Sequence, residues 1–219
     1  DQAGETALSL ARQIHAVYEL LAGMQQEEHA KAPARTRAAT GPGSLQHEHE
    51  RYSHLFQREG FRQVDLQKEG AHRYMSDAQR GAPVGKAIRR RMVELAALHA
   101  SLPGGWNGAI AVVVDETDCS LLKALIIGPT GTPYANGCFV FDVWLPPTYP
   151  ACPPHLKLIT TQPSTRFNPN LYADGSVCLS LLGTWSGPGW IPDTSTLLQV
   201  LVSLHSLVFV PDPYFNEPG

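Results

Sequence analysis

The chain has 219 residues, and its 17 Lys and Arg residues nearly balance 20 Asp and Glu residues, for a net charge of −3. This balance, without a basic stripe interleaved with aromatic residues, excludes the electrostatic footprint of a nucleic-acid-binding protein. The longest apolar stretch, residues 197–210, is shorter than the roughly 20 residues of a membrane-spanning helix. We therefore expect no nucleic-acid partner and no membrane span.

The charge is unevenly distributed along the chain. Residues 1–100 hold 14 basic and 12 acidic residues, whereas residues 101–219 hold 3 basic and 8 acidic residues and 15 of the 18 prolines. The charge-poor part is long enough to bury a core of its own. We expect it to be a catalytic domain, and the charged part to serve mainly for attachment.

Residues 1–30 are predicted to form an amphipathic helix. The apolar residues that define its a/d seam are spaced alternately by four and three: Leu10, Ile14, Val17, Leu21 and Met24. A helix of this length is marginal alone. Two interpretations therefore stay open: self-association through the seam, or packing of the helix on its own domain or on missing parts of a longer chain.

Residues 31–44 combine Ala, Pro, Gly, Thr and Arg without periodicity, which predicts a flexible linker. Residues 45–85 are expected to form an adaptor segment, with a polar helix over residues 45–57 and an extended stretch over residues 61–66. A clear helical spacing follows over residues 86–100 and begins the main domain, residues 86–219.

The main domain is predicted to be α+β, because a helix is followed by strands in series and then by another helix. The expected strands cover residues 109–114, 121–127, 138–145 and 155–159, as an antiparallel meander. A buried helix is expected over residues 195–208, capped by Ser195 or Thr194. Between strands and helix lies a long loop, and a loop of this length inside a compact domain indicates function.

The sequence contains no motif of a metal site or a disulfide framework. Its four cysteines, Cys119, Cys138, Cys152 and Cys178, form no CxxC pair, which suits a reducing, cytoplasmic location. The run His47 to Glu50 lacks the second histidine of a zinc-protease motif, because Arg51 stands there. We expect neither a metal nor a cofactor.

The long loop carries the residues that favour chemistry. Asn168-Pro169-Asn170 is held extended by the proline, and the turn Asp174-Gly175 can fold Asn170 back toward Cys178. A thiol beside an amide donor suits acyl transfer, in which sulfur attacks a carbonyl and the N–H groups stabilise the oxyanion. A cysteine in an apolar run is more often simple packing, so residue types alone leave both interpretations open.

A cysteine protease would need a histidine base. The nearest candidates, His155 and His205, fall in a predicted strand and a predicted buried helix, with no motif around them. A nucleophilic cysteine without a paired histidine points to a substrate that arrives activated, as a thioester does.

Several motifs occur in a fixed order from about residue 86 to residue 219. They are Thr132-Pro133-Tyr134 followed by Gly137, then Tyr149-Pro150 with Pro153-Pro154, then Asn168-Pro169-Asn170 eight residues before Cys178, a tryptophan after that cysteine, and Asp212-Pro213. In these motifs the chain resembles the ubiquitin-conjugating enzymes. The runs YANGCFVFDV, RFNPNLY, GSVCLSLLGTW and PYFNEPG look most like the subgroup of very large conjugating enzymes, of the BRUCE/Apollon type.

The resemblance implies roles for individual residues. Cys178 would carry the modifier as a thioester, Asn170 would order the loop and stabilise the oxyanion, and Glu217 would stand at the gate where the lysine enters. Arg89, Arg90 and Arg91 would dock the activating enzyme. The remaining active-site loop residues would be Asn168, Pro169, Asp174, Gly175, Ser180, Trp185 and Trp190.

Some positions depart from the family pattern. Asn168 replaces the usual first histidine, Ser180 stands where many members carry Asp, and an insertion brings Trp185 and Trp190 to the loop. Ala151 occupies the position at which many members present a Phe to ligases. The C-terminal helices of the family are also expected to be missing, so the chain is expected to be a fragment or to lack them.

The implied partners are ubiquitin or a ubiquitin-like modifier, an activating enzyme and substrate lysines. A ligase, or self-association through the N-terminal helix, completes the set. The alternative is a catalytically inactive variant that acts as a binding module or scaffold, but such variants lose the cysteine that this chain keeps as Cys178.

Overall fold

The computed structural model describes residues 42–67, 72–79, 81, 85–161 and 164–216. The helix expected over residues 1–30, most of the expected linker and Glu217 lie outside these ranges. The elements, in chain order, are α2 (Pro42–Glu59), β1 (Phe61–Val64), α3 (Met75–Ala78), α4 (Gly85–Ser101), β2 (Gly104–Gly105), β3 (Gly108–Asp115), β4 (Leu121–Ile127), β5 (Cys138–Trp144), β6 (His155–Leu158), the 3-10 turn η1 (Ser180–Leu182), α5 (Leu197–Ser203), the π-helical turn η2 (Leu204–Val208) and the 3-10 turn η3 (Pro213–Asn216).

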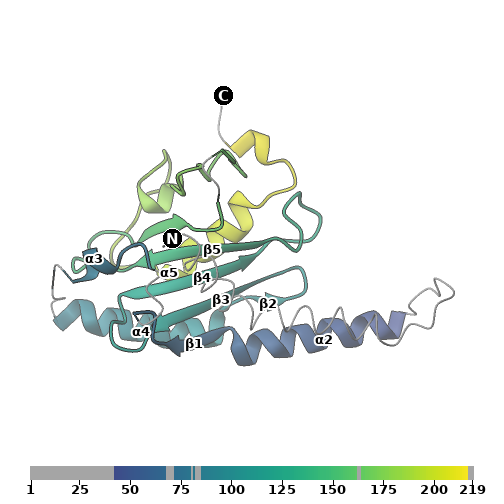
Figure 1. Ribbon diagram of the computed structural model, residues 1–219, viewed down its shortest axis with the longest axis horizontal. Coiled ribbons are helices and arrows are strands. Elements are labelled where there is room, and N and C mark those ends of the chain that lie inside the picture. Colours follow the sequence, from purple (N-terminus) through teal and green to yellow (C-terminus); the bar gives the residue numbers. More distant parts are fainter. Residues whose placement is uncertain (1–41, 68–71, 80, 82–84, 162–163, 217–219) are drawn as a thin grey trace, which may run out of the picture.

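The centre of the fold is an antiparallel meander of β3, β4, β5 and β6 (Figure 1). Its register places Val112 opposite Ala124, Leu125 opposite Val140 and Phe141 opposite Leu158. The predicted α+β class is confirmed, and each strand of the meander lies within a residue of its expected position. The sheet is larger than expected, however, because β1 pairs with β3 in parallel and β2 forms a short antiparallel pair with β3.

The segment set apart as an adaptor, residues 45–85, contributes to this same sheet. Its strand β1 pairs Phe61 with Val112, and its helix α2 buries Tyr52 and Phe56 against one face of the meander. The boundary drawn at residue 86 therefore cuts through the fold. The reason is a parallel pairing between strands far apart in sequence, which no local pattern reveals.

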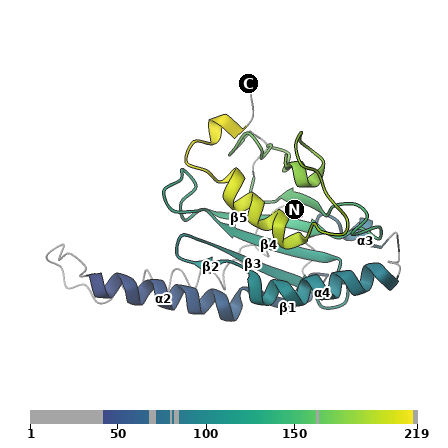
Figure 2. The same ribbon diagram turned by 180° about the vertical axis from the view of Figure 1, so that it is seen from behind.

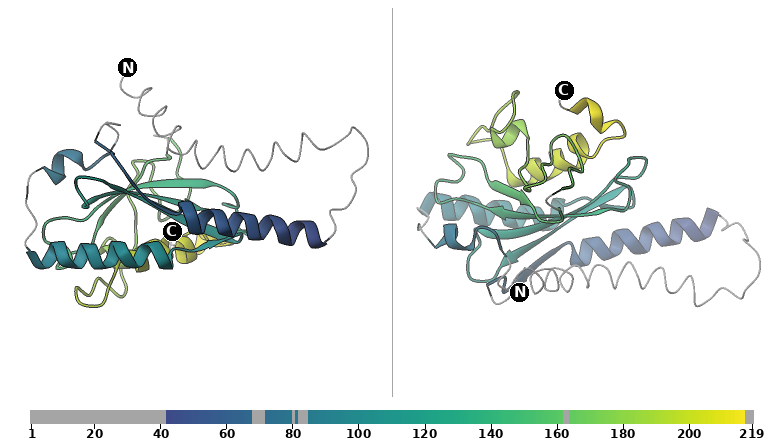
Figure 3. Two further views of the ribbon diagram at one scale, coloured as in Figure 1. Left: turned by 90° about the horizontal axis from the view of Figure 1, so that it is seen from below. Right: turned by 45° about the horizontal axis from the view of Figure 1, so that its top comes forward.

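The other face of the sheet carries the main apolar core and is covered by α4 and α5. Figure 2 shows α5 in front of this face, and Figure 3 (left) shows α4 and α5 together on the side opposite α3. The buried helix residues that pack there are Leu95 and Leu98 of α4 and Leu197, Val200 and Leu201 of α5. Apolar residues at alternating strand positions meet these helices, which is why this half of the architecture is readable from the sequence.

Charged residues are buried on the face that α2 partly covers. Lys123 of β4 and Asp142 of β5 are directly opposite in the register, and their Nζ and Oδ1 atoms are 2.5 Å apart. The backbone N–H of Arg73 donates to Asp142 Oδ2 at 2.6 Å. The stretch before α3 therefore covers the ion pair, and removes it from water.

His72 in this covering stretch is buried as the neutral imidazole. Its Nε2 atom lies 2.8 Å from the carbonyl oxygen of Leu122 and must donate to it, while its Nδ1 atom accepts from the backbone N–H of Tyr74 at 3.2 Å. Burial lowers the pKa of His72, an effect that Asp142 opposes and Lys123 adds to.

The start of α5 lies one or two residues later than predicted. Thr196, rather than Ser195 or Thr194, is the N-cap: its side chain accepts from the N–H of Gln199, and the Gln199 side chain accepts from the N–H of Thr196. This reciprocal capping box satisfies two helix N–H groups at once. No helix in the part of the chain that the structure describes has the length and apolar character needed to cross a membrane.

Candidate functional site

Asn170 and Cys178 lie side by side, bonded to each other through both backbone and side chain. The Cys178 N–H donates to the carbonyl oxygen of Asn170 at 2.8 Å, and Asn170 Nδ2 donates to the carbonyl oxygen of Cys178 at 3.1 Å. Leu171 and Val177 form an antiparallel bridge next to this pair. The turn between them thus brings the amide beside the cysteine, as its spacing predicts.

The turn at Asp174-Gly175 is fixed against the end of the sheet. Gly175 has a φ of +82°, and a Cβ atom there would lie 2.3 Å from the carbonyl oxygen of Leu158, so only glycine fits. The Asp174 carboxylate accepts from the N–H and the hydroxyl of Ser176 and from Lys157 Nζ. These bonds favour the charged form and lower the pKa of Asp174 to about 2, with the Ser176 backbone bond as the largest cause.

Asn168 connects the loop to two distant elements. Its Nδ2 atom donates to the Tyr134 hydroxyl at 2.8 Å and to the carbonyl oxygen of Val208 at 2.7 Å, and its Oδ1 atom accepts from the N–H of Asn170 at 2.8 Å. A side-chain amide supplies two donors and an acceptor on one rigid group. Asn168 therefore anchors the loop, and its relative exposure is only 2%.

The two histidines weighed as bases make contacts of other kinds. The ring of His155 lies 5.2 Å from the ring of Trp144. His205 lies over Gly108, where a Cβ atom would be 2.0 Å from its Nε2 atom. The Cys178 side chain is half-buried and unpaired. The arrangement supports a nucleophile without a histidine partner.

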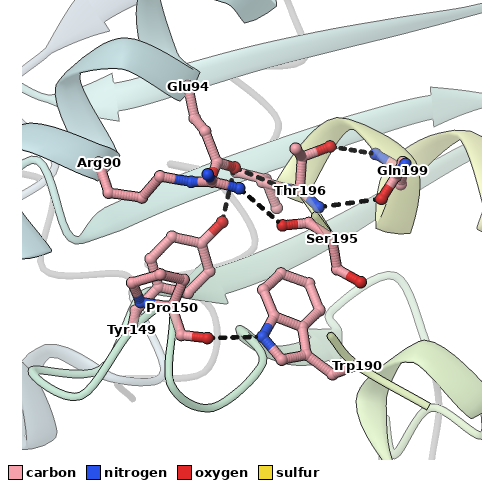
Figure 4. Close-up of polar contacts among 9 residues, drawn as sticks. Arg90, Glu94, Tyr149, Pro150, Trp190, Ser195, Thr196 and Gln199 are labelled. Carbon is pink, nitrogen blue, oxygen red and sulfur yellow. Dashed lines mark hydrogen bonds and ion pairs between the residues drawn. The ribbon is translucent and has the colours of Figure 1, made fainter. Parts of the chain in front are cut away.

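The tryptophan insertion is anchored at its Trp190 end to the segment that holds Tyr149 and Pro150 (Figure 4). Trp190 Nε1 donates to the carbonyl oxygen of Pro150 at 2.7 Å, and its ring lies 5.6 Å from the ring of Tyr149. At the other end Gly187 passes close to Ser180, and Trp185 is partly exposed. Pro169 accepts a bond from Arg166 through its carbonyl oxygen.

Glu94 of α4 organises the region behind this insertion, and sequence analysis did not single it out. Figure 4 shows its carboxylate between Arg90, Tyr149 and the start of α5. Its Oε2 atom accepts from the Tyr149 hydroxyl at 2.6 Å and from the N–H of Leu197 at 2.8 Å, and its Oε1 atom accepts from Arg90. A charged residue on the apolar stripe of the helix, one position before Leu95, was the signal for it.

The three arginines do not form one docking surface. Arg91 is 2% exposed and donates to the carbonyl oxygens of Leu145 and Pro146 at 2.8 and 2.6 Å. Arg90 is half-buried and bonded to Glu94 and to the carbonyl oxygen of Ser195. Only Arg89 is exposed. The docking assignment for Arg91 is wrong, because its position four residues before Leu95 turns it inward.

Across the described ranges, no three His, Cys, Asp or Glu side chains gather in a way that could hold a metal ion.

Comparisons with known proteins show what this chain is similar to. The family model described as ubiquitin-conjugating enzyme matches residues 94–218. Human BIRC6, named a dual E2 ubiquitin-conjugating enzyme/E3 ubiquitin-protein ligase, is 49% identical over 154 residues, which are 68% of this chain and 3% of that protein. The probable ubiquitin-conjugating enzyme protein 17 of Caenorhabditis elegans is 50% identical over 135 residues, 60% of this chain and 18% of that protein.

Human ubiquitin-conjugating enzyme E2 Z is 44% identical over 144 residues, which cover 65% of this chain and 38% of that protein. The solved structure of human ubiquitin-conjugating enzyme E2 G1 aligns with 57% of this chain and 96% of its own, at 28% identity and a TM-score of 0.47. This chain thus spans a small part of the length of the curated relatives it matches.

Proposed function

The chain belongs to the ubiquitin-conjugating enzyme family, and on that premise we propose that it accepts ubiquitin or a ubiquitin-like modifier as a thioester on Cys178 and transfers it to a substrate lysine. The observation that carries the proposal is the reciprocal pairing of Cys178 with Asn170 in a loop anchored by Asn168. The subgroup expected from the sequence is supported by the 49% identity with the conjugating part of a far longer relative.

In the first step the Cys178 thiolate attacks the thioester carbonyl that joins the modifier to the activating enzyme. A new C–S bond forms at Cys178, and the activating enzyme leaves as its own thiolate. The substrate and the product of this step are both thioesters, and a thiolate both attacks and leaves. The step therefore needs no histidine base of the kind that a cysteine protease uses.

In the second step a substrate lysine attacks the thioester on Cys178. Its amine forms the C–N bond of the amide, the C–S bond breaks, and Cys178 leaves as a thiolate while the lysine proton passes to solvent. Negative charge develops on the carbonyl oxygen during the attack. The Asn170 amide carries two N–H groups, of which one is bonded to the Cys178 carbonyl, so a second is available to that charge.

The alternative function is an inactive variant that only binds a partner or serves as a scaffold. The retained thiol at Cys178 and the retained amide at Asn170 argue against it, because neither is needed for binding alone. The matched relatives are named as conjugating enzymes, which favours catalysis as well.

We place the activating enzyme against the exposed face of α4, which presents Arg89 beside the exposed apolar side chains of Ile88 and Met92.

Glu217 stays our candidate for the gate at which the lysine loses its proton. A cytoplasmic location suits four unpaired thiols. Self-association through residues 1–30 remains a proposal, tested by sedimentation of the chain with and without them.

A charging assay with activating enzyme, ATP and modifier tests the proposed function. We expect an adduct that a thiol reductant removes and that Cys178→Ala abolishes, while the control Cys152→Ala charges normally. The proposal would be overturned if the folded wild-type chain failed to charge with ubiquitin and with ubiquitin-like modifiers. Normal charging of Cys178→Ala would also overturn it.

A further inference from the structure

The backbone around Cys178 is extended and has two edges. Asn170 holds one edge, through the N–H and the carbonyl of Cys178 itself. In an extended chain the carbonyl of the preceding residue and the N–H of the following residue point to the opposite edge. Leu179 has φ −150° and ψ 133°, so Val177 and Leu179 direct these groups away from Asn170.

One hydroxyl takes up both groups on that second edge. The Leu179 N–H donates to Thr184 Oγ1 at 2.9 Å, and Thr184 Oγ1 donates to the Val177 carbonyl oxygen at 2.8 Å. A hydroxyl has a single proton and two lone pairs. It can therefore accept from Leu179 and donate to Val177 at once, and so replaces the neighbouring strand that a sheet would supply.

The backbone between Leu179 and Thr184 reverses direction and so brings Thr184 back beside Leu179. It leaves Leu179 through the turn η1 and reverses at Gly183, whose φ of +70° lies in the left-handed region. The Thr184 N–H then lies 3.4 Å from the Leu179 carbonyl oxygen. Since Val177 and Leu179 are 4% and 6% exposed, a backbone N–H or carbonyl group left there without a hydrogen bond would be unfavourable.

We infer that Thr184 is a positioning residue for Cys178: with Asn170 on the other edge, its hydroxyl fixes the backbone that aims the Sγ atom at the incoming thioester. The inference rests on the proposed function of Cys178. Thr184 does not touch the reacting atoms. It acts through the residues on either side of the cysteine. Its loss therefore affects how often the thiol is correctly placed, and not how tightly the modifier-loaded activating enzyme binds.

Thr184→Val removes the hydroxyl and keeps the branched shape, whereas Thr184→Ser keeps the hydroxyl. We expect Thr184→Val to lower the kcat of charging about tenfold, with an unchanged KM for the modifier-loaded activating enzyme. Thr184→Ser should recover the rate to within about twofold of wild type. Thr194→Val, at another exposed threonine of the same region, is the matched control and should charge normally.

Two outcomes would overturn the inference: a folded Thr184→Val chain that charges at the wild-type rate, or a Thr184→Ser chain as slow as Thr184→Val. If Thr184→Val does not fold, hydrogen exchange of the Leu179 amide in the wild-type chain decides, because its N–H is protected only while the hydroxyl bond persists. Exchange at the rate of an unstructured amide would then overturn it.

The same test separates this inference from the proposed function. Alkylation of Cys178 by iodoacetamide, followed on its peptide by mass spectrometry, needs no activating enzyme. If wild type never charges but Thr184→Val changes the alkylation rate and Thr184→Ser restores it, the proposed function fails while the positioning by Thr184 stands. If wild type charges and all three proteins alkylate and charge alike, the reverse holds.

Discussion

The four-stranded meander and the loop of residues 166–190 belong to one fold but are held in place by different interactions. The meander rests on backbone ladders and a buried apolar face, with one buried ion pair. The loop rests on side chains that bond to backbone groups, above all Asn168, Asn170 and Thr184. We therefore expect that changes in the meander lower stability, whereas changes in the loop lower the rate of the proposed transfer in chains that still fold.

The largest expected effect is a loss of stability caused by a change in the meander. Lys123→Met leaves the Asp142 carboxylate buried without its cation, which we expect to lower the free energy of unfolding by about 3–5 kcal/mol. Urea denaturation measures this loss. The charging rate per folded molecule should stay at the wild-type level.

The double variant Lys123→Met/Asp142→Leu is the control for that experiment. Removing both charges leaves no unpaired ion, so most of the lost stability should return. A single variant as stable as wild type, or one that charges slowly although folded, would contradict the division between the two regions.

The next largest expected effect is a slower transfer rate caused by a change in the loop. Asn170→Ala should still charge, but transfer of the modifier to free lysine should slow by about 10²–10³-fold, because an oxyanion donor is missing. Single-turnover discharge measures the rate. The melting temperature should change little.

Asn170→Asp keeps the size of the side chain without its N–H groups, so it should transfer as slowly as Asn170→Ala. Transfer at the wild-type rate in either variant would remove the amide from the mechanism. A large fall in melting temperature would show that the loop contributes to stability as the meander does.

The smallest expected effect is on the pH dependence of stability, through His72 in the stretch that covers the ion pair. The pKa of His72 is lowered in the folded chain by burial, so its contribution to stability is complete above about pH 6.5 and is lost as the pH falls below that value. One proton sets the limit at about 1.4 kcal/mol per pH unit. Unfolding at pH 7.5, 6.5 and 5.5 measures the slope.

Burial also lowers the pKa values of His155 and His205, which therefore add to this slope in the same direction. In His72→Gln the part that belongs to His72 should vanish and the dependence should flatten. An unchanged slope would show that the stretch before α3 opens before His72 titrates.

Local patterns in the sequence predicted much of this fold. The spacing of Leu95 and Leu98 gave α4, and alternation gave the strands of the meander. The pairing of Phe61 with Val112 was not predictable, because a parallel pair depends on chain geometry over about 50 intervening residues rather than on a turn.

At the site, the sequence placed Cys178 and Asn170 together, since a proline and a glycine turn fix the path between them. It misplaced Arg91, because the charge of a side chain says nothing about carbonyl groups that approach from another part of the chain. Glu94 was missed for the same reason: its partners at Tyr149 and Leu197 are brought to it only by the folded structure.

The parallel strand β1 also decides how this protein can be cut. A fragment that begins at residue 86 would expose the β3 edge at Val112–Asp115, where three valines and an aspartate lose the backbone partners that β1 supplies. An unprotected apolar edge of this kind is a template on which other chains add strands. Strand β1 covers this edge, so a fragment for crystallisation or engineering should begin no later than α2.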